Sequence, residues 1–514
     1  MLFSSWQFIL VFLPVAAAVF ALIPARFRAA RKWWLLAASL AFYGWWKLEY
    51  IPLLLFSIGL NYAAAEGITR SRQPDRSRWI LQAGVAANLA LLGYFKYTNF
   101  LLYNAGKLTG HHFPHLDIVL PLAVSFFTFT QIGYLVDVSR DKKLHYGPLD
   151  YALFVVFFPH LIAGPIVRHW EVIPQYAEKD LRPDGIDWAT GVTLFLCGLC
   201  KKLLLADTAA VFANTVFDAA ARGASLNWFD AWLGTLAFTV QLYFDFSGYS
   251  DMAIGLARIF GIKFPANFDS PYQARSIAEF WQRWHMTLTR FLREYLYIPL
   301  GGNRCSAPRQ IFNVMATFLL SGLWHGAGWT YIAWGGIHGA ALVVTQKWRN
   351  WRPGFLWSEN HWAAVLMGRA GTFLLVVLAW VFFRAANLGT AGRMLASMLG
   401  LHGLTMSAKA IETGGAPFRW LAGAGVRVIP DSLGMADYNK PWHWTAALLL
   451  LAWLAPNTQQ LLAACNPVMG FTPRPTRWRF PIGAPLGFIL GALMFQVLRS
   501  RYFTPESPFL YFNF

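Results

Sequence analysis

The feature that most constrains this chain is a series of long apolar stretches that recurs from one end of the sequence to the other. A transmembrane helix needs about 20 mostly apolar residues, and helices satisfy every backbone polar group inside lipid. The candidate spans lie at residues 6–23, 33–47, 50–68, 79–95, 118–138, 187–206, 228–248, 310–327, 329–346, 362–384, 443–463 and 481–498. We therefore predict an all-α polytopic membrane protein with about 11 to 13 transmembrane helices.

The composition supports a location in a membrane. Hydrophobic residues make up 56% of the sequence and charged residues 13%, whereas soluble proteins carry about 25% charged residues. The formal net charge of +18 is explained by basic cytoplasmic loops that contact anionic membrane lipids. The sequence contains no nucleic-acid-binding motif, so we expect no nucleic acid partner.

Clusters of basic residues predict the orientation of the chain. Loops rich in Lys and Arg remain on the cytoplasmic side, and even numbers of candidate spans separate most of the clusters. The clusters lie at residues 26–32, 70–78, 140–143, 347–352 and 474–479. This spacing places both termini outside the cytoplasm. Lys201 and Lys202 contradict the pattern, and we interpret them as side chains that snorkel to the membrane surface.

Two stretches do not fit simple spans. Residues 151–168 are apolar but contain Pro159 and Pro165, and proline interrupts helices. A broken helix at membrane depth must be buried in protein or line water, so we expect a re-entrant or in-plane element. Residues 404–441 lack a long apolar run and are expected to form an external loop. We find no separate soluble domain and treat residues 1–514 as one transmembrane domain.

Residues 276–297 predict an amphipathic helix at the membrane interface. Apolar and aromatic side chains recur there at i, i+3 and i+4 spacing, while Arg and Glu residues occupy much of the opposite face. His285 follows Trp281 by four residues and precedes Leu288 by three, so it should point toward the apolar face. This histidine is either a buried structural residue or a functional one.

The next span carries the strongest candidate for a functional residue, His325. If residues 310–325 are helical, His325 lies about 22 Å beyond the basic turn that precedes them. An ionisable group at that depth is costly and marks a functional site by default. Glycines around it, such as Gly322 and Gly326, would let a substrate or a backbone approach closely. His338, on the following span, is a second candidate for the same cavity.

The stretch QLYFDFSGYSDMAIG, residues 241–255, places Asp245 and Ser247 within an apolar region. Buried carboxylates can orient a histidine or line a wet channel, and a capping role is an open alternative. The histidines of HHFPH, residues 111–115, fall in an expected external loop and are interpreted as solvated. We predict no metal site.

These motifs resemble the membrane-bound O-acyltransferase family, and in particular its bacterial branch that contains the alginate O-acetyltransferase membrane subunit. The matching pieces keep their order along the chain: PHLIAGPIVR (159–168), residues 241–255, residues 267–304, LSGLWHGAGWTYIAWGGIHG (320–339), VFFRAANL (381–388), PNTQQ (456–460) and FLYFNF (509–514). The resemblance implies helices around a central funnel or tunnel, a catalytic core at about 118–346, and catalytic roles for His325 and His285.

The resemblance also implies a reaction. Acetyl-CoA would be the acyl donor, with no permanently bound cofactor, and His325 would act as general base. The residues expected to bind the donor or line its tunnel are Asp245, Ser247, Arg275, Arg283, Trp284, Asn303, Arg304, Trp324 and His338. Tyr511, in the aromatic tail that follows the last span within residues 481–514, would relay the acetyl group. The protein would lie in a bacterial inner membrane and hand the group to a periplasmic acetyltransferase that modifies an extracellular polysaccharide such as alginate.

Other functions remain open at this point. A transporter or channel would use buried His and Asp side chains as a proton relay, and a scaffold of a polysaccharide synthase would need no catalytic histidine. A relative of the same family could instead acylate a lipid, a protein or a teichoic acid. For Tyr511, a purely structural role as an interfacial aromatic anchor is the alternative.

Overall fold

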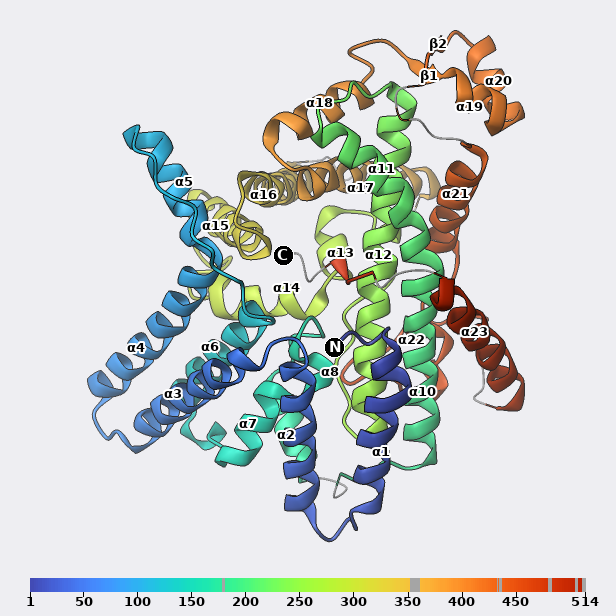
Figure 1. Cartoon of the computed structure of the whole chain (residues 1–514). Coiled ribbons are helices and arrows are strands. Elements are labelled where there is room, and N and C mark those ends of the chain that lie inside the picture. Colours follow the sequence, from blue (N-terminus) through green and yellow to red (C-terminus); the bar gives the residue numbers. More distant parts are fainter. Residues whose placement is uncertain are drawn as a thin grey trace.

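The computed structural model of the protein consists almost entirely of helices (Figure 1). It describes residues 1–177, 181–351, 361–431, 433, 437–478, 483–503 and 507–510. The helices are α1 (Leu13–Leu22), α2 (Arg28–Gly44), α3 (Ile51–Arg70), α4 (Pro74–Leu92), α5 (Thr98–Thr109), α6 (Val124–Arg140), α7 (Pro148–Val156), α8 (Phe158–Leu161), α9 (His169–Val172), α10 (Gly185–Cys200), α11 (Asp207–Ala221), α12 (Trp228–Ile259), α13 (Ile277–Trp281), α14 (Met286–Leu292), α15 (Ala307–His325), α16 (Trp329–Trp351), α17 (Trp362–Arg384), α18 (Leu388–Met398), α19 (Ala408–Gly414), α20 (Ala416–Gly423), α21 (Asn439–Leu454), α22 (Thr458–Leu461) and α23 (Ala484–Phe503). The π-helical segments are η1 (Gln7–Phe12), η3 (Gly93–Tyr97), η7 (Lys201–Ala206) and η9 (Arg293–Tyr297), the short 3₁₀ turns are η2 (Leu48–Tyr50), η4 (Lys142–Leu144), η5 (Ile173–Tyr176), η8 (Pro271–Gln273) and η10 (Ala463–Cys465), and the strands are β1 (Thr405–Ser407) and β2 (Arg427–Ile429).

The predicted fold class, an all-α polytopic membrane protein, is confirmed. Within the described residues, three helical segments are long and apolar enough to cross a membrane, namely Leu48–Arg70, Gly185–Ala221 and Trp362–Arg384. Each of the other predicted spans overlaps a helix of the structure, but those helices are shorter or more polar. The predicted total of membrane crossings therefore stays a prediction.

The centre of the molecule is the contact between α10 and α12, which pack side by side (Figure 1). Glycines on the two helices face each other in pairs. A Cβ added to Gly198 would lie 2.4 Å from the carbonyl oxygen of Gly248, and one added to Gly255 would lie 2.5 Å from that of Gly191. Small residues of this kind let helix backbones touch inside a membrane. The α12 helix is consequently buried along nearly its whole length.

This close contact corrects our interpretation of the two lysines that follow α10, at the start of η7. Lys201 pairs with Asp251 at 2.6 Å, and Lys202 pairs with Asp245 at 2.7 Å, both across the α10–α12 interface. The Lys202 side chain is 1% exposed, so it does not reach the membrane surface. The snorkelling prediction is wrong because it considered the lysines without the carboxylates of α12, which are more than 40 residues away in sequence.

The glycines near His325 serve the packing of α15 against α16. A Cβ on Gly322 would lie 2.2 Å from the carbonyl oxygen of Tyr331, and one on Gly326 would lie 2.1 Å from its ring. The neighbours that approach these glycines are therefore protein backbone and the Tyr331 ring. The sequence left open whether a substrate or a protein backbone approaches these glycines. The structure shows a protein backbone at Gly322.

The prediction of one continuous helix over residues 276–297 is wrong. The segment divides into α13, α14 and η9, and His285 at the first break has a left-handed backbone with φ 45°. Arg283, expected on the polar surface, is 3% exposed. The break is invisible in the sequence because no proline or glycine marks it.

The two segments that did not fit simple spans also have defined structures. Residues 151–168 form α7, then a break at Phe157, then the short helix α8, and nearly all of this segment is buried. The broken, buried element is thus confirmed, while its depth in a membrane stays a prediction. The predicted loop 404–441 contains α19, α20 and the parallel pair β1–β2 around a small apolar core that includes Met406 and Phe418. It is a folded unit rather than irregular chain.

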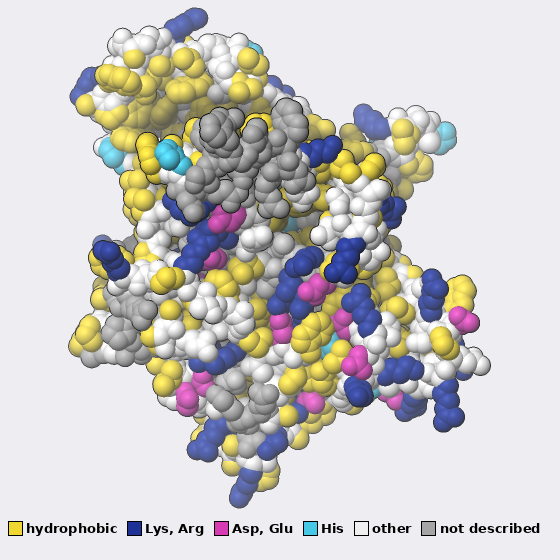
Figure 2. Space-filling view, turned by 180° about the vertical axis from the view of Figure 1, so that it is seen from behind, with side chains coloured by type: hydrophobic (Ala, Val, Ile, Leu, Met, Phe, Trp, Pro, Cys, Tyr) yellow, Lys and Arg dark blue, Asp and Glu magenta, His cyan; other side chains and the backbone are white. Residues whose placement is uncertain are grey.

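The two ends of the molecule differ in character. The basic connections α1–α2 and α3–α4 lie at one end, and the unit of β1, β2, α19 and α20 lies at the other (Figure 1). Apolar side chains are spread over the face shown in Figure 2, with many Lys and Arg side chains over its lower half. The orientation of the chain in a membrane stays a prediction.

We predict that Gly335→Ala destabilises the protein. Its Cβ would lie 2.2 Å from the carbonyl oxygen of Phe318 on α15, and forcing α15 and α16 apart should cost roughly 1–3 kcal/mol. Gly336→Ala is the matched control, because its Cβ would meet only Leu319 Cδ2 at 3.5 Å. Thermal unfolding in detergent should show a lower midpoint for Gly335→Ala alone, and equal midpoints for the two variants would contradict this account of the interface.

Candidate active site

His325 is the last residue of α15, and α15 positions it deep in the bundle. The helix has 19 residues, so roughly 27 Å of helix separates His325 from its first residue, Ala307. The imidazole is 4% exposed and packs among aromatic rings. Its ring centroid lies 5.1 Å from that of Trp334 and 5.4 Å from that of Phe383. An aromatic enclosure of this kind keeps bulk water away from the histidine.

His285 lies in the turn between α13 and α14 and is fully buried. Asn267 holds this turn in place, because its backbone carbonyl accepts the Met286 N–H at 3.0 Å and its side-chain oxygen accepts the Thr287 N–H at 3.3 Å. The Thr287 hydroxyl in turn accepts the N–H of Ile166 at 2.9 Å. The non-helical chain after α8 therefore supports the turn that carries His285.

These contacts also fix the tautomer of His285. The Asn267 side-chain oxygen accepts a backbone N–H, so its amide orientation is determined. Nδ1 of His285 lies 3.1 Å from that oxygen and must donate to it, which leaves the lone pair of the neutral ring on Nε2. His285 lies outside the predicted spans. Burial lowers its pKa to about 3, so the ring is neutral at physiological pH and Nε2 is a proton acceptor.

His338, on α16, completes a group of three histidines. It is fully buried, and neither ring nitrogen has a hydrogen-bond partner among the described residues. The Trp334 ring lies 5.0 Å from His338 and also contacts His325. His285 and His338 both lie close enough to His325 to interact with it electrostatically. The structure thus brings together all three histidines that the sequence singled out.

A wall of stacked indoles runs between these histidines. Trp334 stacks on Trp380 with a centroid separation of 5.8 Å, and Trp284 lies 5.1 Å from Trp380. Trp324 stacks on Phe129 at 5.0 Å. The predicted lining residues Trp284 and Trp324 are therefore both buried beside the histidines, where they exclude water from the site.

Lys96 and Tyr97 of η3 hold the end of α15 that carries His325. The Lys96 ammonium donates to the Trp324 carbonyl at 2.5 Å, and the Tyr97 hydroxyl donates to the Leu323 carbonyl at 2.9 Å. The last carbonyls of a helix have no partner inside the helix, and a cation there is favoured by the helix dipole. Both contacts therefore fix the helix terminus next to His325.

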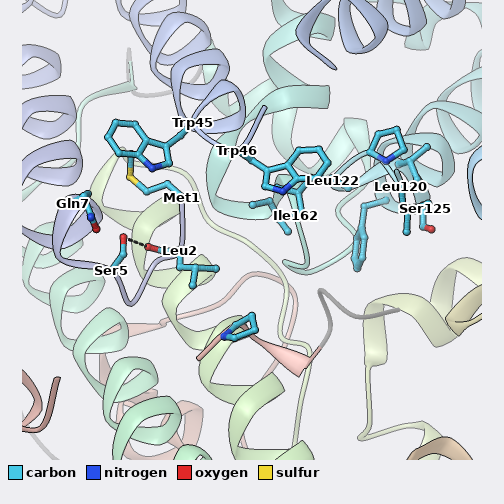
Figure 3. A pocket seen from close by; sticks show the side chains of 15 residues that line it. Met1, Leu2, Ser5, Gln7, Trp45, Trp46, Leu120, Leu122, Ser125 and Ile162 are labelled. Carbon is cyan, nitrogen blue, oxygen red and sulfur yellow. Dashed lines mark hydrogen bonds between the residues drawn. The ribbon is translucent and has the colours of Figure 1, made fainter. Parts of the chain in front are cut away.

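A cavity of about 500 Å³ lies between the N-terminal segment and the start of α6 (Figure 3). Figure 3 shows the N-terminal residues Met1, Leu2 and Ser5 on one side of it and Leu120 and Ser125 on the other. Two wall residues reach the site. The Ser125 hydroxyl accepts from Lys96 at 3.3 Å, and the Phe126 ring lies 5.5 Å from Trp324.

The other end of the cavity touches the C-terminal tail, because Pro508 lines it. The predicted central funnel or tunnel stays a prediction.

Of the three arginines expected to bind the donor, Arg275 and Arg283 lie close together and Arg304 does not lie with them. Arg283 pairs with Glu279, and Glu279 also accepts the backbone N–H of Arg275 at 2.6 Å. Arg304 and Asn303 lie in the exposed turn between η9 and α15. Arg474, from a distant loop, lies 3.6 Å from Glu279. Arg283 and Arg474 therefore lie close together, because both approach the Glu279 carboxylate.

Asp245 and Ser247 lie on the buried centre of α12. Asp245 is 2% exposed and pairs with Lys202, which makes it part of an ion-pair network rather than a histidine partner. The Ser247 hydroxyl is buried with no hydrogen-bond partner among the described residues. Tyr511 lies outside the described residues, and the described tail ends at Leu510.

Sequence reasoning missed several of these residues. Lys96 stands at the end of a predicted span, and a charged residue at that place was the signal that could have identified it. Asn267 lies inside one of the motifs quoted above, and Arg474 lies in a basic cluster that was used only for orientation. No local feature of the sequence predicts that Arg474 and Arg283 approach the same carboxylate, because they are far apart in the chain.

The sequence model of MBOAT, the membrane-bound O-acyltransferase family, matches residues 81–383, a region that contains His285, His325 and His338. A peptidoglycan O-acetyltransferase of Helicobacter pylori is 44% identical over 436 residues, which cover 79% of this chain and 81% of the relative. A probable alginate O-acetylase of Pseudomonas aeruginosa is 43% identical over 412 residues, which cover 77% and 75%. A teichoic acid D-alanyltransferase of Bacillus subtilis is 28% identical over 331 residues, which cover 62% and 80%.

Proposed function

The chain belongs to the membrane-bound O-acyltransferase family, and from this premise we propose that it moves an acetyl group from cytoplasmic acetyl-CoA across the inner membrane to O-acetylate a polysaccharide outside the cytoplasm. It is an acyl-transferring enzyme. The observation that carries the proposal is the buried His325, held at a helix terminus among aromatic rings.

We propose that His325 acts as the general base. The imidazole removes the proton from an attacking hydroxyl, and the hydroxyl oxygen bonds to the thioester carbonyl carbon. The carbon–sulfur bond then breaks, and the CoA thiolate takes the proton back from the imidazolium. The apolar rings around His325 favour transfer over hydrolysis, because an active site without water protects a reactive thioester.

His285 has a different role in this proposal. Its neutral ring donates from Nδ1 to Asn267, so Nε2 presents a lone pair. We propose that this buried imidazole lies against the pantetheine arm and orients the donor. Asn267 is then a positioning residue, since it fixes the tautomer and the backbone of His285.

The charged end of the donor would bind where Arg283 and Arg474 approach Glu279. Arginine matches phosphate geometry well, and the buried Arg283 Nε and Nη1 have no hydrogen-bond partner among the described residues. Arg275 and Arg304, both exposed, would contribute at longer range.

We propose that Tyr511 relays the acetyl group to the partner. Its phenol would be the attacking hydroxyl, and the phenolate is a better leaving group than a sugar alkoxide because the phenol pKa is near 10. The acetyl-tyrosine would retain enough transfer potential for a periplasmic acetyltransferase to pass the group to a sugar. The neighbouring tail residue Pro508 lines the cavity whose wall residues Ser125 and Phe126 contact Lys96 and Trp324, which supports this assignment over a membrane anchor.

The acceptor in this proposal is a polysaccharide outside the cytoplasm. The relatives named for peptidoglycan and for alginate are 44% and 43% identical to this chain, a difference that favours neither polymer. The relative named for teichoic acid is only 28% identical. Acetyl analysis of both peptidoglycan and exopolysaccharide, with and without the gene, distinguishes the acceptors. A transporter or scaffold would leave the acetyl content of both unchanged.

We predict that His325→Ala abolishes acetyl transfer while the protein remains folded. Loss of a general base costs about 10²–10⁴-fold in rate. The measurement is incorporation of labelled acetyl groups into polymer, normalised to folded protein. His160→Ala is a matched control, because His160 is also buried but donates to the Phe154 carbonyl away from the site. Near-normal incorporation with His325→Ala would overturn the proposed mechanism.

We predict that Tyr511→Phe also abolishes transfer to polymer, with normal membrane insertion. The substitution keeps the aromatic ring and removes only the hydroxyl that would carry the acetyl group. Tyr502→Phe removes a hydroxyl from the same C-terminal segment and should leave transfer intact. Wild-type acetylation with Tyr511→Phe would mean that Tyr511 is an anchor and that the acetyl group takes another route.

A further inference from the structure

The described end of the tail, residues 507–510, is bound to the middle of the helix bundle. Its Phe509 side chain is fully buried and meets Tyr249 of α12 edge to face at a centroid distance of 4.8 Å. The Lys202 ammonium lies 4.7 Å from the centre of the same ring. An aromatic side chain buried between a cation and a tyrosine is a specific contact rather than a loose association.

Lys202 is placed to hold the tail. Its ammonium pairs with Asp245 at 2.7 Å and with Asp207 at 2.8 Å. It also donates to the Pro508 carbonyl at 3.1 Å and lies 3.3 Å from the Ser507 hydroxyl. A lysine has three N–H donors, and two of them bond to the carboxylates. The tail carbonyl therefore completes the coordination of a charge that is 1% exposed.

Asp245 also forms a hydrogen bond with the tail. One carboxylate oxygen bonds Lys202, and the other accepts the backbone N–H of Leu510 at 3.0 Å. The Ser507 hydroxyl donates to Asp207 at 3.1 Å. Without the tail, a lysine N–H and a carboxylate oxygen would remain unsatisfied at a buried site, which is costly. The ion pair and the tail therefore stabilise each other.

We propose that Lys202 and Asp245 form a clamp that binds residues 507–510 and thereby fixes where the next residue, Tyr511, is presented. Both are positioning residues, since they act through the tail and touch no reacting atom. The clamp as a binding site rests on the contacts above, whereas its importance for acetyl transfer rests on the proposed function. Because the contacts to the tail are made by the ion pair itself, the tail should detach when the pair is broken.

The test measures release of the tail directly. Leu510→Cys, in a background without the four native cysteines, supplies a half-buried thiol whose reaction with a maleimide is timed in purified protein. Lys202→Met should increase the labelling rate at least about tenfold, because each lost hydrogen bond to a charged group weakens docking by roughly that factor. Lys202→Arg keeps the charge and should restore much of the protection.

Matched controls separate detachment from general damage. Lys201→Met breaks the neighbouring ion pair with Asp251 and should leave the labelling rate unchanged. Lys202→Met leaves two buried carboxylates without their lysine, so a second variant acts from the tail side. Phe509→Ala weakens the same docking without altering the bundle and should also speed labelling. Thermal unfolding of each variant verifies that it is folded.

The outcomes distinguish the clamp from the proposed function. Parental labelling rates in folded Lys202→Met or in Phe509→Ala would overturn the clamp. His325→Ala should leave labelling slow while transfer is lost. If His325→Ala retained transfer but Lys202→Met released the tail, the proposed function would fail and the clamp would stand. Loss of transfer in Lys202→Met, with rescue by Lys202→Arg, would establish that the clamp serves the reaction.

Discussion

The backbone-to-backbone contact between α10 and α12 is the interaction on which the rest of the structure depends. Because Gly198 and Gly248 let the helices touch, Lys202 in η7, directly after α10, reaches Asp245 on α12. The same ion pair then binds the C-terminal tail. A larger residue at either glycine would separate the charges and leave them buried without partners, which costs more than the contact itself contributes.

The two halves of the site are held by different elements. The chain that leaves α12 supplies Asn267, which fixes the turn and the tautomer of His285. On the other side, η3 fixes the end of α15 through Lys96 and so positions His325. Aromatic rings fill the space between them. This division suits a reaction in which one side receives the donor and the other delivers the acyl group.

The sequence predicts much of this organisation and misses its long-range part. Apolar length predicts helices, and the depth of His325 in an apolar segment predicts a buried site, because both depend on local sequence. The break at His285 has no local marker, since tertiary contacts to Asn267 stabilise a left-handed residue that is not glycine. Lys202 was misinterpreted for a related reason: its carboxylate partner lies on another helix.

The central claim is that the enzyme carries an acetyl group from one face of the membrane to the other. The most direct measurement compares sealed inside-out and right-side-out membrane vesicles that contain the protein, each supplied externally with radiolabelled acetyl-CoA, which does not cross membranes. The account predicts that label enters the polymer only in inside-out vesicles, where the cytoplasmic face is accessible. Equal labelling in both orientations, or labelling only in right-side-out vesicles, would contradict it.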